Sequence, residues 1–316
     1  MSTIKFQLAD HAAVVARVSD LKNRSDDIKA RIGPTLKKLW NSERSLHHIP
    51  DLSVFQTLRT RFPNFLEVLD IWEASAIASS KTGNPFQSSP ILLAGDPGLG
   101  KTYFVGEAAK ALRIPYFEMS MATASAGFIL AGNSSQWADN EVGFVAKSLA
   151  RSSVANPFFL IYELDKANGR RDNDPLGPLF PLLEHHSAMK FKDESLDIEI
   201  DASRIIWLAT ANDLDDIPAP IKDRMRICQI QMPSPHQMPQ VIKSVYHNIR
   251  AHQPYGSLLD EEIPEEVIEA LSGLTPRKVR QSIEEGAMQV IRADRTGLLL
   301  DDIKVKQEGR RRYGFL

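Results

Sequence analysis

PILLAGDPGLGKTYF, residues 90–104, joins an apolar run to a glycine-rich loop that ends in a lysine and a threonine. The loop fits the spacing G-x-x-x-x-G-K-[ST], in which glycines let the backbone curl so that successive N–H groups face one anion. A helix that begins directly after the loop adds unsatisfied N–H groups and the positive end of its dipole, and both favour a phosphate group. We therefore expect a phosphate site made of Gly95, Asp96, Pro97, Gly98, Leu99, Gly100, Lys101, Thr102 and Tyr103.

The lysine and the hydroxyl at the end of such a loop have separate tasks. Lys101 can reach the β- and γ-phosphates of a nucleotide, and the hydroxyl of Thr102 can bind Mg²⁺. A tight strand-to-helix turn that binds no ligand could have the same sequence pattern. The apolar run before the loop and the amphipathic pattern after it favour the phosphate site, because this motif needs a strand before it and a helix after it. The sequence therefore predicts nucleotide binding with Mg²⁺.

Short apolar runs alternate with longer segments over residues 90–232. Continuous apolar runs of this kind are typical of parallel strands that are buried on both faces of an α/β sheet. The flanking parts show helical periodicity instead. We expect strands at 91–95, 116–120, 158–164, 204–211 and 226–232, and three parts of the chain: a helical region at 1–82, an α/β nucleotide-binding core at 83–233 and a helical lid at 234–316.

Particular residues predict where several helices begin or stop. Asp10 is expected to cap a first helix, and Gly33-Pro34 is expected to interrupt the helical pattern. Asn64 is expected to cap a further helix. In the last part of the chain, Thr275 is expected to cap a helix that opens with Pro276.

Polar residues follow three of the predicted strands. Glu163 comes at the end of the run FFLIYEL and is placed to polarise a water molecule. The run WLATAN offers Thr210 and Asn212, and its strand should lie between the FFLIYEL strand and the phosphate loop, so that one of these groups meets the γ-phosphate. The segment IPAPIKDRM then carries Asp223 and Arg224. Acidic and polar groups at the ends of neighbouring strands can handle Mg²⁺ and an attacking water.

Taken together, these motifs resemble a known family. The phosphate loop, NPFFLIYELDK (156–166), PLGPLFPLLE (175–184) and ATANDLDDIPAPIKDRM (209–225) are similar to AAA+ ATPases, and within that class to the ATPase module of Lon-type proteases. The resemblance runs from about residue 64 to about residue 300. It implies an AAA+ P-loop NTPase core with a parallel sheet and a C-terminal helical lid, and ATP with Mg²⁺ as the ligands.

The resemblance also implies a role for individual residues. Glu163 would be the catalytic glutamate, Asn212 the sensor of the γ-phosphate, and Arg224 an arginine finger that acts on the nucleotide of a neighbouring subunit. Arg277 would be the sensor on the lid, with Arg280 as the alternative. Each arginine could instead be an ordinary solvated charge.

Trp137 falls where the family has the aromatic residue of its pore loop. It lies in GNSSQWADN, a polar segment that gives a tryptophan little reason to be there for packing alone. In the pore it could grip an extended polypeptide through its apolar surface. The alternative is a tryptophan that folds back onto the sheet.

The sequence departs from the family pattern in two ways. Tyr162 occupies the place of the Walker-B aspartate, whose charge normally helps to hold Mg²⁺. A neutral phenol should weaken Mg²⁺ handling, unless Asp165 compensates after a bend at the strand end. In addition, no segment of this sequence is expected to form the Ser–Lys peptidase domain of Lon-type proteases, so no peptidase site is expected in this chain.

The composition excludes some classes of protein. The net charge is −2, which gives no overall basic field for nucleic acid, although Lys304, Lys306, Arg310, Arg311 and Arg312 form a basic tail. No apolar run approaches the length of a membrane span, and no secretory signal is visible, so a cytoplasmic location and no membrane contact are expected. The single cysteine, Cys228, fits a reducing compartment and is expected to be buried in a strand.

These features favour a slow ATPase that remodels a protein partner as a homo-oligomeric ring, expected to be a hexamer. One alternative is a nucleotide-dependent switch or scaffold with little or no hydrolysis, because Tyr162 replaces an aspartate. A second is a nucleic-acid-associated AAA+ ATPase, because of the basic tail. The balanced net charge argues mildly against this second alternative.

Overall fold

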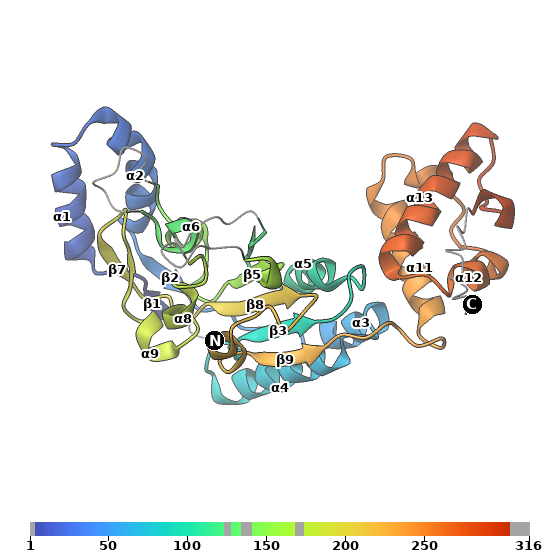
Figure 1. Ribbon diagram of the computed structural model, residues 1–316, viewed down its shortest axis with the longest axis horizontal. Helices are drawn as coiled ribbons and strands as arrows, with labels where there is room; N and C mark the ends of the chain where they lie inside the picture. Colours follow the sequence, from blue (N-terminus) through green and yellow to red (C-terminus); the bar gives the residue numbers. More distant parts are fainter. Residues whose placement is uncertain (1–3, 123–127, 134–140, 168–173, 304–316) are drawn as a thin grey trace, which may run out of the picture. The chain divides into compact units, whose positions relative to one another are not determined.

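The computed structural model describes residues 4–122, 128–133, 141–167 and 174–303 (Figure 1). These residues form two compact units. The first unit contains the described residues of Met1–Leu58, Phe65–Asp96 and Lys101–Ile230. The second contains those of Arg59–Asn64, Pro97–Gly100 and Gln231–Leu316.

A five-stranded sheet forms the centre of the first unit. Its strands are β3 (Ile91–Ala94), β4 (Tyr116–Ser120), β5 (Phe158–Tyr162), β8 (Ile206–Ala211) and β9 (Arg226–Gln229). The order is β4-β5-β8-β3-β9, and every neighbouring pair is parallel. All residues of β3 and β8 are buried, which explains their continuous apolar runs. The predicted α/β class is therefore confirmed, with some strands ending two or three residues earlier than expected.

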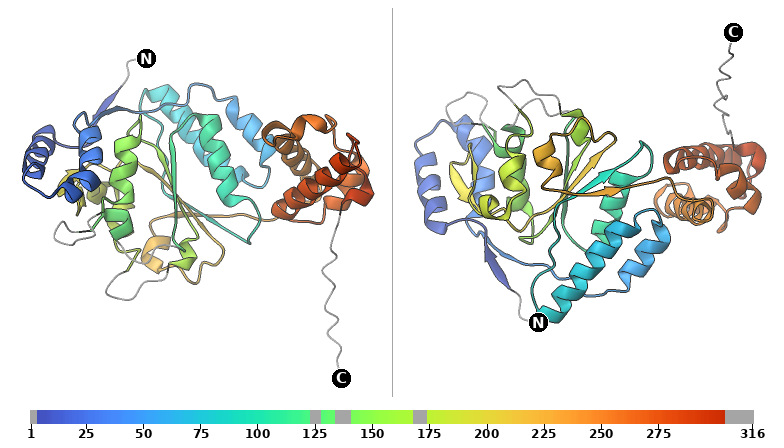
Figure 2. Two further views of the ribbon diagram at one scale, coloured as in Figure 1. Left: turned by 90° about the horizontal axis from the view of Figure 1, so that it is seen from above. Right: turned by 60° about the horizontal axis from the view of Figure 1, so that its bottom comes forward.

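Aromatic side chains attach helices to both faces of this sheet. On one face, Trp72 of α4 (Leu66–Thr82) stacks on Phe104 of α5 (Lys101–Leu112), with ring centroids 5.7 Å apart. Figure 2 shows these two helices side by side. On the other face, Phe159 meets both Phe144 of α7 (Phe144–Arg151) and Trp207 of β8 at 5.3 Å. The helix after the phosphate loop is thus fixed against the sheet by buried aromatic rings.

The N-terminal part packs into the same core. It contains β1 (Lys5–Gln7), α1 (His11–Leu21), α2 (Asp26–Leu39), β2 (Glu43–Ser45) and α3 (Val54–Arg61), and β1 pairs with β2. Apolar residues of α1 and α2 such as Val14, Ile32 and Leu36 are completely buried in a cluster that includes the face of the sheet opposite α4. The two strands add to the helices that the sequence predicts for this part of the chain.

Two predictions about helix ends are wrong. Helix α2 continues through Gly33-Pro34, because the buried residues Ile32, Thr35, Leu36 and Leu39 hold both halves of the helix to the core. The interruption lies before α2, where the side chain of Ser25 caps the new helix. Asn64 does not cap α4, since Phe65 takes the cap position and Asn64 instead donates to the carbonyl oxygen of Gln231. The predicted cap at Asp10 is confirmed.

A hairpin of β6 (Phe191–Asp193) and β7 (Ile198–Ile200) is held by two buried charged residues. Asp193, with no exposed surface, accepts from the backbone N–H groups of Gly143, Ser195 and Leu196 at 2.8–3.0 Å. Arg17 of α1 donates to the carbonyl oxygens of Ser195 and Leu196. The hairpin turn is therefore joined to α1 on one side and to the start of α7 on the other.

The second unit is helical. Its main elements are α11 (Met238–His252), α12 (Glu265–Leu271) and α13 (Pro276–Arg292), with the short helices η3 (Gly256–Leu258) and η4 (Leu300–Asp302). Tyr246, Val279 and Ile283 are completely buried in its core. Thr275 caps α13 as the sequence predicts, because its side chain accepts from the N–H of Lys278. Among the described residues, no helix has the length and apolarity to pass through a membrane.

Asp193 makes the stability of the first unit depend on pH. Burial raises the pKa of Asp193 to about 6, although the three backbone N–H groups act to lower it. The folded protein therefore holds a proton on this group at pH values where the unfolded chain has already lost it, so its contribution to stability falls as pH rises from about 4 to about 6. The difference between the pKa of Asp193 in the folded protein and its ordinary value corresponds to up to about 3 kcal/mol of unfolding free energy.

The measurement compares urea unfolding of the wild type and of Asp193→Asn between pH 4 and pH 7. We expect the wild type to lose stability relative to the variant as pH rises through this range. A difference between the two proteins that stays constant with pH would contradict the prediction.

Candidate nucleotide-binding site

The phosphate loop has the backbone shape that its glycines allow. Gly98 and Gly100 have φ angles of 86° and 88°, in the left-handed region that disfavours other residues. A Cβ atom added at Gly100 would meet no heavy atom within 4 Å, so the space beside this part of the backbone is open. This shape fits a phosphate group close to the main chain.

Lys101 links the loop to the neighbouring strand. Only 7% of its surface is exposed. Its Nζ atom donates to the carbonyl oxygen of Gly95, to that of Asp96 at 2.9 Å and to Oδ1 of Asn212 at 3.0 Å. Asn212 directly follows β8, and β8 lies between β5 and β3 as the sequence predicts. The structure thus brings together two of the predicted site residues, Lys101 and Asn212.

Thr102 and Tyr103 begin α5 and are both exposed. The Thr102 hydroxyl is therefore open to a ligand at the loop, as the prediction of a metal-binding oxygen requires. Asp96 is also exposed, whereas Leu99 is buried. Within the loop, Asp96 and Pro97 are thus exposed, and Gly98 and Gly100 on either side of Leu99 are half-buried.

Polar residues line the carboxyl edge of the sheet next to the loop. Ser120 of β4 is the register partner of Tyr162 of β5. The backbone N–H of Glu163 donates to Oγ1 of Thr210 at 3.2 Å, and the hydroxyl of Ser120 donates to Oε2 of Glu163 at 3.3 Å. Parallel strands bring their carboxyl ends to one edge, so residues far apart in the sequence meet there.

Glu163 has an uncommon backbone conformation. Its φ and ψ angles are 57° and 46°, the left-handed region, which costs a non-glycine residue about 1 kcal/mol or more. The conformation ends β5 and starts the short helix η1 (Leu164–Lys166). The side chain of Glu163 is exposed at this turn, where a water molecule can reach it.

The oxygen ligands for Mg²⁺ are incomplete at this edge. Tyr162 is half-buried and offers a phenol hydroxyl in place of a carboxylate. Asp165 is buried, and its carboxylate lies 2.8 Å from Nζ of Lys166. Burial acts to raise the pKa of Asp165, but the Lys166 ammonium and the Asn212 backbone N–H outweigh it and hold the pKa below its usual range. The carboxylate oxygens of Asp165 have no hydrogen-bond partner among the described residues, and the side chain is buried beside Lys166. Exposed oxygen donors at this edge include Thr102 and Glu163.

Arg224 follows α10 (Ala219–Lys222) and is held by two acceptors. Its Nε and Nη2 atoms lie 2.7 and 2.5 Å from Oε1 of Glu184, and Nη1 donates to the carbonyl oxygen of Pro220 at 2.7 Å. Glu184 lies between α8 (Leu179–Leu182) and α9 (His185–Ala188). Neither of these acceptors, Glu184 or Pro220, belongs to the predicted nucleotide site.

Further predicted residues come from other parts of the chain. Arg277 is exposed in the first turn of α13, in the second unit, and its backbone N–H donates to the carbonyl oxygen of Gly98 in the phosphate loop at 3.1 Å. Its role stays a prediction. Arg280 is bound within that unit, to Oδ1 of Asn248 and to Glu284, which makes it the less available of the two. Trp137 lies outside the described residues. Cys228 is buried in β9, as predicted, and burial raises the pKa of its thiol to about 12.

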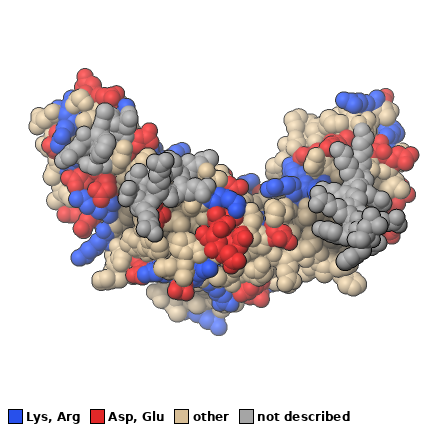
Figure 3. Space-filling model, in the orientation of Figure 1, with Lys and Arg blue, Asp and Glu red and all other residues tan. Residues whose placement is uncertain are grey.

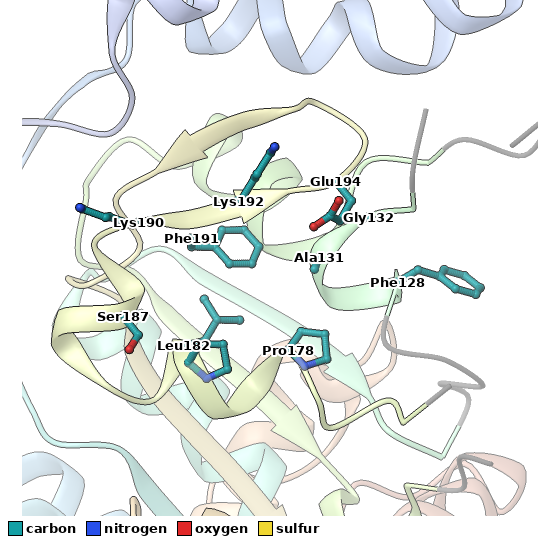
Figure 4. A pocket seen from close by; sticks show the side chains of 11 residues that line it. Phe128, Ala131, Gly132, Pro178, Leu182, Ser187, Lys190, Phe191, Lys192 and Glu194 are labelled. Carbon is teal, nitrogen blue, oxygen red and sulfur yellow. The ribbon is translucent and has the colours of Figure 1, made fainter. Parts of the chain in front are cut away.

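A separate groove of about 400 Å³ lies at the hairpin side of the first unit. Figure 4 shows Leu182, Pro178 and Phe191 facing one another in it, with Lys190 and Lys192 at its rim. No predicted nucleotide-site residue lines it.

The sequence analysis missed Ser120 and Glu184. Ser120 ends the run YFEMS, and a polar residue at the end of a predicted strand is the signal that could have found it. Glu184 ends PLLE beside two histidines, and nothing in that pattern points to Arg224, 40 residues later. Only the fold brings Glu184 and Arg224 together.

Comparison with known proteins agrees with this geometry. A model of the AAA family, the ATPase family associated with various cellular activities, matches residues 91–233. The Lon protease of Campylobacter jejuni is 26% identical over 271 residues, which is 85% of this chain and 34% of that protein. The Lon protease of Metamycoplasma arthritidis is 32% identical over 156 residues, which is 48% of this chain and 19% of that protein. The chain thus spans about a third of these relatives' length or less.

Solved structures show the same fold. Two mutants of RuvB from Thermotoga maritima each match with a TM-score of 0.52, at 14% and 16% sequence identity. They cover 75% and 78% of this chain, and 67% and 71% of their own chains are matched. The sheet order, the phosphate loop and the family match thus fall on the same residues, so residues 91–233 form a domain that matches the AAA family of ATPases, in a chain that is similar to Lon proteases over part of their length.

Proposed function

We propose that this protein is a slow ATPase that binds ATP with Mg²⁺ and works on a protein partner as a homo-oligomeric ring. The observation that carries the proposal is the hydrogen bond between Lys101 and Asn212, because it places a loop cation beside the strand end where a γ-phosphate would lie. The family match supports the ATPase class. The ring, the partner and the slow rate are inferences for this chain.

The residues present fit the phosphates of ATP better than its metal ion. The loop offers backbone N–H groups, the Lys101 ammonium and the Thr102 hydroxyl. Mg²⁺ is usually held by one or two carboxylates in addition to the phosphates, and Tyr162 replaces the expected one. Glu163 would orient the attacking water, with Ser120 and Thr210 holding it in place. The protein would depend on the metal ion that ATP brings with it.

The protein partner is proposed from the resemblance to Lon-type ATPases. Trp137 would contact an extended polypeptide in the centre of the ring, and a hexamer is the expected assembly. A nucleotide-dependent switch with little hydrolysis is the second candidate, because Tyr162 removes a charge from the metal site. A nucleic-acid partner has less support, since Lys and Arg residues are interspersed with Asp and Glu on the face shown in Figure 3.

Lys101→Ala should abolish ATP binding, because it removes the cation next to the β- and γ-phosphates. Isothermal titration calorimetry with ATP and Mg²⁺ measures the effect. Lys110→Ala is the matched control, since Lys110 lies on the same helix, 75% exposed, in a pair with Glu107. Unchanged ATP affinity in Lys101→Ala would refute the phosphate site.

Tyr162→Asp should raise turnover, most clearly at low Mg²⁺, because it restores a carboxylate beside the metal ion. The Mg²⁺ concentration for half-maximal turnover should fall by roughly tenfold or more. Tyr162→Phe is the control, because it changes the side chain without adding charge, and it should show no such fall. Turnover that is equal in the wild type and Tyr162→Asp at every Mg²⁺ concentration would disprove the weak metal site. No hydrolysis in any of the three assembled proteins would favour the switch.

Arg224→Ala should lower turnover of the assembled protein by up to about 10³-fold and leave ATP affinity nearly unchanged, because an arginine finger stabilises the charge of the transition state. Steady-state turnover as a function of protein concentration is the measurement. Arg226→Ala, which removes a nearby exposed arginine paired with Glu67, is the matched control. Turnover that is independent of both Arg224 and concentration would rule out a shared site in a ring.

A further inference from the structure

The Arg224 side chain has a defined orientation although part of it is exposed. The side chains of Arg224 and Glu184 are 31% and 46% exposed. Exposed ion pairs usually contribute little to stability, and long side chains at a surface usually sample many rotamers. Here Glu184 takes one edge of the guanidinium and the carbonyl oxygen of Pro220 takes another. The geometry fixes the plane of the group.

Buried neighbours fix the backbone on both sides of this ion pair. Ile221 and Met225 flank Arg224, and Leu182 and Leu183 precede Glu184. All four belong to one apolar cluster, with 7% exposure or less. The two charged residues therefore project from elements that share a core, so the carboxylate is a rigid support for the guanidinium.

The pattern of contacts leaves part of the guanidinium available. A guanidinium group has five N–H donors. Within the described residues, hydrogen bonds use the N–H of Nε and one N–H of Nη1, and Nη2 lies 2.5 Å from Oε1 of Glu184. At least one N–H on each terminal nitrogen therefore remains for a phosphate oxygen.

We infer that Glu184 is a positioning residue that holds Arg224 in the orientation needed to reach the nucleotide of a neighbouring subunit. The inference rests on the proposed function of Arg224. Glu184 does not touch the nucleotide, and it acts by limiting where the guanidinium can point. A displacement of about 1 Å in a group that contacts the transition state can lower the rate by about 10²-fold.

The first measurement is the turnover of assembled Glu184→Gln, which keeps the side-chain shape and removes the charge. Turnover should fall by roughly 10–100-fold, with KM for ATP and the melting temperature nearly unchanged. Glu184→Asp, which keeps the charge on a shorter side chain, should give an intermediate rate. Glu184→Gln should add nothing to Arg224→Ala. Glu67→Gln removes an exposed carboxylate that also pairs with an arginine, and it should not change turnover.

Mixed assemblies separate positioning in trans from a local structural defect. Glu163→Gln subunits keep a normal Arg224 but should not hydrolyse ATP. In an equal mixture with Glu184→Gln subunits, only the Glu184→Gln subunits keep Glu163 and can hydrolyse ATP. On average, half of these active sites face a Glu163→Gln neighbour with an undisturbed Arg224. Turnover per active site should therefore rise to about half of the wild-type rate. Subunits carrying both Glu163→Gln and Glu184→Gln should restore nothing.

The outcomes distinguish the two proposals. If Arg224→Ala leaves turnover unchanged, the arginine-finger proposal fails and this inference fails with it. If Arg224→Ala is slow but Glu184→Gln has the wild-type rate, only the role of Glu184 is refuted. A faster Glu184→Gln would show that Glu184 holds Arg224 away from the nucleotide, which is the opposite of the inference. A slow Glu184→Gln that Glu163→Gln subunits do not rescue would assign Glu184 a local structural role and overturn positioning in trans.

Discussion

The parallel order of β5, β8 and β3 is the constraint on which the candidate site depends. Because parallel strands end at the same edge, the loop after β3, the turn after β5 and Asn212 after β8 come together although they are far apart in the sequence. The Lys101 ammonium then joins two of these strand ends through the loop carbonyls and Asn212. Burial of both faces of the sheet keeps the edge rigid, since aromatic residues of α4, α5 and α7 hold the strands from either side.

The fold was predictable where one local pattern decided the outcome. Periodicity predicts the five apolar runs of the sheet, and capping chemistry predicts the cap at Thr275. Motif spacing predicts the place of Asn212 beside the loop. Gly33-Pro34 shows the limit of such arguments. Local chemistry favours a break there, but the burial of Ile32 and Leu36 on either side favours a continuous helix, and burial of that kind is decided by the rest of the fold.

The sequence names several residues of the candidate site, but it does not show the contacts that connect them. The phosphate-loop residues and Glu163 carry recognisable spacing. The support of Glu163 by Ser120 and the ion pair of Glu184 with Arg224 depend on contacts between elements that no short motif encodes. Asp165 is a similar case. In the sequence it is a candidate substitute for the missing aspartate, whereas in the fold its carboxylate is buried against Lys166 and the Asn212 backbone.

The buried pairing of Arg17 with the hairpin turn bears on how this chain can be divided. The family match begins at residue 91, yet α1 and α2 supply part of the apolar cover of the sheet, and Arg17 satisfies carbonyl groups at residues 195 and 196. A fragment trimmed to the family boundaries would expose that apolar surface to water and leave the turn without its donor. The N-terminal helices therefore belong to the folding unit of the ATPase domain, and a soluble, minimal version of it has to include them.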